Sequence, residues 1–151
     1  MRVFNPALFI VKVSNFCNLS CEYCYVNKDS SILEKQDLEK IAFLISKWII
    51  NMRLNKVKIG FLGGEPLLHI DKLEFFIRTL NKKLGAFRDK VIYSLQTNCV
   101  NISEKVIEFI SEKQIKLGVS LDGPKEIHDK ARIFPNGRGS YQLIVKNLKL
   151  T

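Results

Sequence analysis

Three cysteines, Cys17, Cys21 and Cys24, lie within eight residues of one another. Thiolates this close in sequence can ligate one metal centre, and clustered cysteines in a reducing compartment indicate metal binding or catalysis rather than a disulfide framework. Iron–sulfur cubes commonly take four cysteine ligands, so three would leave one iron for an exchangeable ligand. A zinc site completed by His69 or His128, or plain buried thiols, are the other interpretations of this spacing.

Four polar, glycine-containing or cysteine-containing segments follow or end stretches that are predicted to be strands. They are residues 17–24 after 8–13, Gly63-Gly64-Glu65-Pro66 after 57–62, Gln96-Thr97-Asn98 after 91–95, and Ser120 to Pro124 at the end of 116–121. In parallel βα folds the carboxyl ends of the strands share one rim, where ligands bind. We therefore expect these four segments to face one pocket.

A helical pattern follows the cysteines. Ser31 and Glu34 have the spacing of a capping box, in which the serine accepts from the backbone and the glutamate reaches back. Apolar residues then recur at three- and four-residue steps as far as Met52, which predicts an amphipathic helix. On this pattern we expect Trp48 to belong to the core rather than to a ligand site.

Three more helices are predicted further along the chain. Asp71 is expected to cap one that ends before Gly85, and others are expected from about Ser103 and from Ser140. Residues 125–139 are expected to form a loop. Strands that alternate with helices in this way predict an α/β fold with a parallel sheet and right-handed crossovers.

Four βα units are too few to close a barrel. We expect a partial (βα) barrel similar to a TIM barrel, with the fourth strand as an exposed edge. We interpret residues 1–151 as a single domain that is the N-terminal part of something longer, or that needs a partner at this edge.

The composition is that of a globular protein, with 46% hydrophobic and 26% charged residues. The net charge of +9 comes from lysines that are scattered along helical segments, a pattern typical of solvated helix faces rather than of a nucleic-acid interface. No secretory signal and no apolar run of membrane-spanning length is recognisable. We therefore predict a cytoplasmic protein.

The cysteine motif, with the aromatic Tyr23 before its last cysteine, resembles the cluster loop of radical S-adenosylmethionine (radical SAM) enzymes. The similarity extends to other motifs, which are Phe61 to Leu68, Ser94 to Asn98, Gly118 to Pro124, and His128-Asp129-x-x-Arg132 followed by Gly137-x-Gly139-Ser140. Together they resemble the branch with anaerobic sulfatase-maturating enzymes and related SPASM-type peptide maturases. In that branch the barrel continues, and an auxiliary-cluster domain follows; neither is expected within these 151 residues.

The resemblance implies two cofactors. Cys17, Cys21 and Cys24 would hold a [4Fe-4S] cluster, and the amine and carboxylate of S-adenosyl-L-methionine would chelate its open iron. Reduction of the cluster in such enzymes yields a 5'-deoxyadenosyl radical that abstracts hydrogen from the substrate. An external electron donor of the flavodoxin or ferredoxin type is also implied.

The resemblance further implies which residues surround S-adenosyl-L-methionine. Gly64 would meet its ammonium with support from the charge of Glu65, Arg132 would pair with its carboxylate, and the loop of Tyr23 would touch the adenine. The expected cofactor-binding residues are Tyr23, Gly63, Gly64, Glu65, Pro66, Gln96, Asn98, Ser120 and Arg132.

Other residues near the predicted site are expected to shape the backbone or to order a loop. Cys99 stands where this branch usually has glycine, so we expect a slightly altered backbone there and no role for Cys99 as a cluster ligand. Asn98 is able to adopt a left-handed turn. His128 and Asp129 are expected to order the loop that carries Arg132 rather than to act as acid and base.

The predicted activity is radical modification of a peptide or protein side chain. A non-catalytic cluster-binding remnant, or a half-barrel completed by another chain, is the alternative. A zinc-binding module with a basic surface for nucleic acid is a weaker one.

Overall fold

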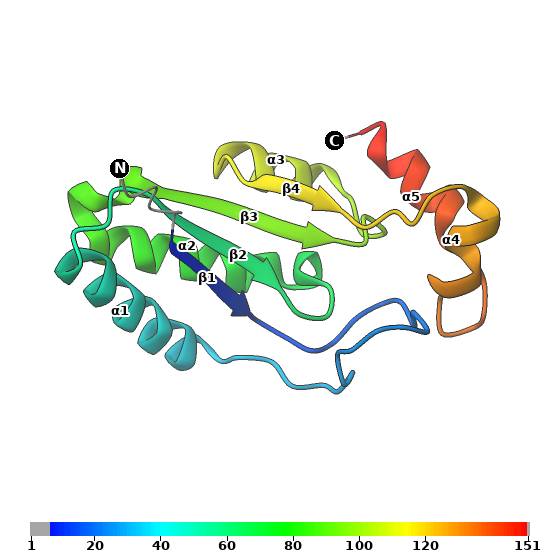
Figure 1. Cartoon of the computed structure of the whole chain (residues 1–151), viewed down its shortest axis with the longest axis horizontal. Helices are drawn as coiled ribbons and strands as arrows, with labels where there is room; N and C mark the ends of the chain where they lie inside the picture. Colours follow the sequence, from blue (N-terminus) through cyan, green and yellow to red (C-terminus); the bar gives the residue numbers. More distant parts are fainter. Residues whose placement is uncertain (1–6, 151) are drawn as a thin grey trace, which may run out of the picture.

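Four parallel strands form one sheet in which the strand order follows the chain, β1-β2-β3-β4 (Figure 1). A computed structural model describes residues 7–150. The strands are β1 (Ala7–Lys12), β2 (Val57–Leu62), β3 (Val91–Thr97) and β4 (Lys116–Val119), and each pair of neighbours is parallel. The predicted α/β class and partial barrel are therefore confirmed.

Helices follow each strand. They are α1 (Lys35–Asn51), the 3-10 helix η1 (Pro66–His69), α2 (Ile70–Leu84), the 3-10 helix η2 (Gly85–Lys90), α3 (Glu104–Glu112), α4 (Lys125–Ala131) and α5 (Tyr141–Leu148). In Figure 1, α1, α2 and α3 lie along one side of the sheet, while α4 and α5 lie beyond the carboxyl ends of the strands. The strand ends thus face the α4–α5 pair.

The core lies between the sheet and its covering helices. One stripe of each of α1 and α2 is fully buried against alternate strand residues, as expected for amphipathic helices on a pleated surface. The fully buried side chains include Leu38, Ala42, Ile49, Ile59, Phe61, Leu73, Phe76 and Leu80. The ring of Phe61 packs edge-on against Phe76 with centroids 5.9 Å apart and stacks on Tyr93.

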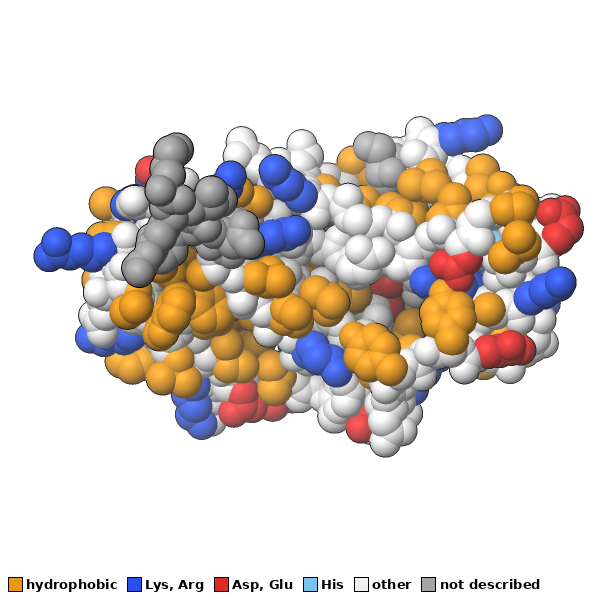
Figure 2. Space-filling model, in the orientation of Figure 1, with side chains coloured by type: hydrophobic (Ala, Val, Ile, Leu, Met, Phe, Trp, Pro, Cys, Tyr) orange, Lys and Arg blue, Asp and Glu red, His pale blue; other side chains and the backbone are white. Residues whose placement is uncertain are grey.

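No helix among residues 7–150 covers the other face of the sheet (Figure 1). Leu8 and Ile10 of β1 are 57% and 56% exposed. Gly60 and Ser94 lie level with Ile10 on the next two strands, where Gly60 is buried and Ser94 is half-buried. Hydrophobic side chains gather over β1 and α1 on the face shown in Figure 2. In the described part of the chain, β1 and β4 are the two edges of the sheet, as predicted for β4.

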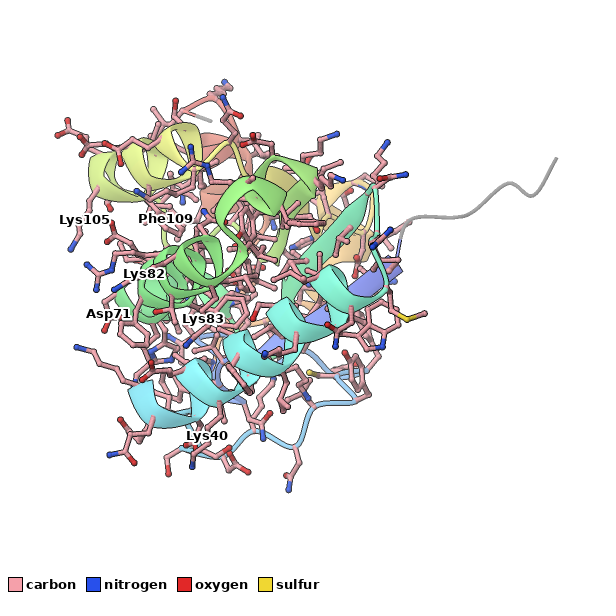
Figure 3. All side chains as sticks on the ribbon, turned by 90° about the vertical axis from the view of Figure 1, so that its left-hand side faces the viewer. Lys40, Asp71, Lys82, Lys83, Lys105 and Phe109 are labelled. Carbon is pink, nitrogen blue, oxygen red and sulfur yellow. The ribbon has the colours of Figure 1, made fainter. Side chains whose placement is uncertain are left out.

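The positive charge is distributed over the helices. The labelled Lys40 comes from α1, Lys82 and Lys83 from α2, and Lys105 from α3 (Figure 3). Lys83 pairs with Glu39 at 3.6 Å. This arrangement is that of solvated helix faces, as the sequence pattern indicated.

The predicted capping box at the start of α1 is wrong. The residue that precedes α1 is Glu34, whose side chain makes no capping bond. The hydroxyl of Ser31 instead donates to Asp29. The backbone carbonyl of Ser31 accepts from the backbone N–H of Asn15 at 3.2 Å. Ser31 therefore ties the end of the cysteine-containing segment to its beginning, because the chain returns to its own strand end before the helix starts.

Two predictions about the helices also fail. Asp71 lies in the first turn of α2 rather than capping it, because η1 starts the helical geometry earlier. Trp48 is 45% exposed and packs edge-on against Phe9, with ring centroids 5.3 Å apart. The buried stripe of α1 runs through Ile45 and Ile49, one step around the helix from Trp48.

Element ends shift as well. β3 continues to Thr97 and β4 stops at Val119, so the two strands are respectively longer and shorter than predicted. The predicted loop 125–139 contains α4, which follows Pro124 and is supported by an ion pair of 2.7 Å between Lys125 and Asp129. In the part of the chain described, no helix is long and apolar enough to cross a membrane.

Candidate functional site

A cavity of about 230 Å³ lies at the carboxyl ends of the strands. Its lining combines segments that are far apart in the sequence. The residues that line it are Cys17, Cys21, Tyr23, Cys24, Tyr25, Val26, Lys28, Leu62, Gly63, Gly64, Glu65, Gln96, Thr97, Asn98, Ser120 and Arg132. Every residue of the predicted site lies here except Pro66, which is buried at the start of η1.

The cysteine loop, residues 14–32, is held from two sides by backbone hydrogen bonds. On one side the N–H groups of Gly64 and Glu65 donate to carbonyls at the beginning of the loop, both at 2.9 Å. On the other side Ser20 donates to Ile133 at 2.7 Å, and Glu22 donates to Ala131 at 3.0 Å. The thiols are therefore fixed between the end of β2 and the end of α4.

Gly64 is needed for this arrangement. A Cβ at this position would lie 1.9 Å from the carbonyl oxygen of Phe16, and one at Gly63 would lie 2.4 Å from that of Ser14. Gly63 also has a φ of 132°, which side chains rarely tolerate. Gly63 and Gly64 thus allow the backbone of the cysteine loop to pack closely against the end of β2.

Glu65 is 2% exposed and joins β2 to β3. Its Oε1 accepts from the backbone of Leu67 at 3.0 Å and from the hydroxyl of Thr97 at 2.8 Å, while Oε2 accepts from the backbone of Asn98 at 2.7 Å. Burial raises the pKa of Glu65, and these three hydrogen bonds oppose that effect. The buried carboxyl group of Glu65 therefore connects the end of β2 to the end of β3 at the wall of the cavity.

Polar side chains at the ends of β3 and β4 are also interconnected. The amide of Asn98 donates to Asn18 Oδ1 at 2.7 Å, and the amide of Gln96 donates to Ser120 Oγ at 2.9 Å. The left-handed residue is Cys99, with a φ of 58°, and not Asn98. Cys99 thus keeps a backbone conformation that glycine favours, and its thiol is buried away from the cavity.

Arg132, Asp122 and Tyr23 form a cluster at the rim. Arg132 Nε lies 3.0 Å from Asp122 Oδ1, as an ion pair rather than an aligned hydrogen bond. The guanidinium lies over the Tyr23 ring, 5.4 Å from its centroid, and the Tyr23 hydroxyl donates to Asp122 Oδ2. Partial burial and this hydrogen bond raise the pKa of Tyr23 to about 12.

Asp122 is a site residue that sequence reasoning did not assign. Partial burial raises the pKa of Asp122, but the Tyr23 hydroxyl and the Arg132 charge outweigh it and hold that pKa below its ordinary value. Lys28 was also missed, although it lines the cavity and its ammonium donates to the carbonyl of Leu19 at 2.7 Å. An acid directly after the predicted strand 116–121 could have signalled Asp122, whereas nothing distinguishes Lys28 from other lysines in the sequence.

Cys17, Cys21 and Cys24 are the cysteines that line the cavity. Burial raises the pKa of Cys17 and Cys21, and none of the cysteines forms a disulfide. Among residues 7–150, no group of three His, Cys, Asp or Glu side chains converges as one metal ion requires. Neither His69 nor His128, the histidines considered as a fourth zinc ligand, lines the cavity.

Comparisons with known proteins identify the family. The family model described as the Radical SAM superfamily matches residues 11–151. The chain is 39% identical to an uncharacterized protein of Methanocaldococcus jannaschii, over 87% of this chain and 43% of that protein. It is 34% identical to a cysteine-type anaerobic sulfatase-maturating enzyme of Clostridium novyi, over 95% of this chain and 40% of the enzyme.

Solved structures agree with the sequence comparison. The structure described as native anSMEcpe with bound AdoMet and Cp18Cys peptide matches 97% of this chain and 40% of its own, with a TM-score of 0.82 and 29% identity. The chain thus spans about two fifths of the length of the curated relatives it matches. It belongs to the radical SAM superfamily, whose cofactors, S-adenosyl-L-methionine and a [4Fe-4S] cluster, are those that the resemblance implied.

Proposed function

We propose that residues 1–151 form the N-terminal part of a radical SAM core domain that modifies a peptide or protein side chain. Cys17, Cys21 and Cys24 would ligate the [4Fe-4S] cluster. The observation that carries this proposal is that all three thiols line one cavity together with Gly64 and Arg132, although these residues come from separate parts of the chain. When bound, the two cofactors supply a 5'-deoxyadenosyl radical that takes hydrogen from the substrate.

The chain's own residues would bind and orient the cofactors. Backbone hydrogen bonds on both sides of the cysteine loop hold the segment that carries the thiols. Asn98 and the backbone of Leu19 donate to Cys17 Sγ, at 3.7 and 3.4 Å, and would support a ligating thiolate. The loop is thus organised for ligation on three thiolates.

S-adenosyl-L-methionine would occupy the rest of the cavity. Arg132 is suited to pair with its carboxylate, because Asp122 and the Tyr23 ring already hold the guanidinium at the rim. The buried charge of Glu65 would favour the ammonium next to Gly64. The remaining proposed contacts are Tyr23, Gly63, Gln96, Asn98 and Ser120, all of which line the cavity; Pro66 would act only by shaping η1.

The proposed substrate is a peptide or protein, and the proposed electron donor is a flavodoxin-type or ferredoxin-type protein in the cytoplasm. Relatives named as sulfatase-maturating enzymes support the substrate class, as does the Cp18Cys peptide bound in the matching anSMEcpe structure. Another relative is named as a radical SAM cyclopropyl synthase, TigE. The donor follows from the need to reduce the cluster by one electron.

Anaerobic reconstitution with iron and sulfide tests the proposal. We expect about four irons per chain with the charge-transfer absorption of a cube, and S-adenosyl-L-methionine should perturb the electron spin resonance signal of the reduced cluster. Formation of 5'-deoxyadenosine after reduction would demonstrate activity. Binding of a single zinc, with no response to S-adenosyl-L-methionine, would overturn the proposal.

A half-barrel that needs a partner chain is the second candidate. The uncovered sheet face and the two sheet edges in the described chain favour it. A cluster that forms and responds to S-adenosyl-L-methionine without yielding 5'-deoxyadenosine would indicate this half-barrel or a non-catalytic remnant.

A further inference from the structure

His128 is fully buried and makes hydrogen bonds through both ring nitrogens. Nδ1 lies 3.3 Å from the backbone N of Asp122, and Nε2 lies 3.0 Å from Ser140 Oγ. Ser140 Oγ lies 2.7 Å from the carbonyl oxygen of Arg132. One imidazole is thus connected to both members of the Asp122–Arg132 ion pair.

The directions of these hydrogen bonds are fixed by chemistry. The N–H of Asp122 can only donate, so Nδ1 of His128 must be unprotonated. The carbonyl of Arg132 can only accept, so the Ser140 hydroxyl donates to it and accepts from Nε2–H. The network therefore requires neutral His128 with its proton on Nε2.

We propose that His128 is a positioning residue of the cofactor site, which holds Arg132 and Asp122 in place against Tyr23. This inference rests on the proposed function, which gives Arg132 its task. Asp122 accepts from the Tyr23 hydroxyl, and Tyr23 lies between two of the thiols in the sequence. A shift of the imidazole would therefore reach both the guanidinium and the cysteine loop.

Neighbouring contacts keep the imidazole in place. Asp129 Oδ1 accepts from the backbone of Tyr141 at 2.9 Å, and the Tyr141 ring packs edge-on against His128, with centroids 5.7 Å apart. A Cβ at Gly139 would lie 2.1 Å from the Asp129 carboxyl carbon, so only glycine admits that carboxylate. These contacts connect α4 to α5 around the His128 ring.

Two substitutions separate the two arms of the network. His128→Asn can keep an acceptor for Asp122, and His128→Gln can keep a donor for Ser140. In each reconstituted variant we expect labelled S-adenosyl-L-methionine to bind at least tenfold more weakly in equilibrium dialysis at pH 8. Ser140→Ala removes the hydroxyl link from His128 to Arg132 and keeps the backbone bond from Ser140 N to the Arg132 carbonyl at 3.2 Å. It should weaken binding in the wild-type background and have little further effect on His128→Asn.

Amide hydrogen exchange gives a readout that does not depend on the cofactor. The Asp122 amide should exchange at least tenfold faster in His128→Gln, which lacks the Nδ1 acceptor, and less so in His128→Asn. Ile144→Val is the matched control, because it reduces buried contacts in α5 without touching the network. It should lower the unfolding temperature and leave the affinity unchanged.

The outcomes are distinguishable. Unchanged affinity in folded His128→Asn, His128→Gln and Ser140→Ala would overturn the positioning role, as would equal losses in Ile144→Val. If the wild-type protein binds no S-adenosyl-L-methionine, the proposed function fails. The exchange of the Asp122 amide then still decides whether His128 holds Asp122.

Discussion

At the scale of single residues, the steric need for glycine at position 64 can be tested by substitution. Gly64→Ala would place a methyl group 1.9 Å from the backbone oxygen of Phe16, so the cysteine loop must move. We expect a loss of more than about 3 kcal/mol in the free energy of unfolding, with loss of bound iron. Gly85→Ala is the control, because nothing lies within 4 Å and only its φ of 55° opposes a side chain. It should cost about 1 kcal/mol in urea unfolding; equal effects would contradict the steric explanation.

The cysteines differ in their expected roles. Replacing Cys17, Cys21 or Cys24 singly by alanine should abolish the cluster, measured as iron per reconstituted chain, because each would ligate a different iron. Cys99→Gly should retain the iron, since Cys99 does not line the cavity and its φ of 58° suits glycine. Loss of iron in Cys99→Gly alone would contradict this assignment.

His128 should make stability depend on pH. Burial lowers the pKa of His128 below its ordinary value. The negative charges of Asp122 and Asp129 oppose this effect, and the positive charge of Arg132 adds to it. The Tyr141 ring packs against the imidazole. As the pH decreases, His128 is therefore protonated at a higher pH in the unfolded chain than in the folded chain. Stability is retained above about pH 6.5 and falls as the pH decreases below it. Urea unfolding at pH 7.5 and 5.5 should show a larger loss for wild type than for His128→Asn.

At the scale of elements, α5 is attached to the sheet through Asn147. Its amide donates to the carbonyls of Cys99 at 2.9 Å and Val100 at 3.0 Å, and the side chain is 6% exposed. Asn147→Ala leaves both carbonyls without this donor and should cost about 2 kcal/mol in urea unfolding. Lys146→Ala, on the exposed side of the same helix, should change stability by less than about 0.5 kcal/mol. A small effect of Asn147→Ala would show that α5 is held by its apolar contacts alone.

At the scale of the whole molecule, the sheet face that no helix of residues 7–150 covers exposes hydrophobic side chains of β1. Leu8 and Ile10 are more than half exposed beside an edge strand, which favours pairing with another chain. We expect the 151-residue chain to self-associate in light-scattering measurements, and Leu8→Lys with Ile10→Lys to shift it toward the monomer. Replacing the already solvated Lys40 by Ala should leave the association unchanged. A stable wild-type monomer would contradict this expectation.

Structural features that depend on residues close together in the sequence were predicted correctly. The apolar stretch of β2, the buried stripe of α2 and the start of α3 at Ser103 depend on neighbouring residues, so periodicity and capping chemistry reveal them. Ser103 indeed accepts from the backbone of Val106 at 3.3 Å. The predicted capping box at Ser31 failed because the Ser31 hydroxyl donates to Asp29, two residues away, and accepts from the side chain of Asn15 at the start of the cysteine loop.

The sequence by itself determined the parallel α/β order and the three-thiol motif, and so the set of strand ends that meet at one cavity. Only the tertiary structure shows that Gly64 packs against the backbone of Phe16, that Asp122 pairs with Arg132, and that the His128 ring contacts Asp122 and Ser140. Tyr23 and Asp122 are 99 positions apart, and Asn98 and Asn18 are 80 apart. Such contacts depend on how complete elements pack, because a side chain's own neighbours in sequence do not set its distance from another strand end.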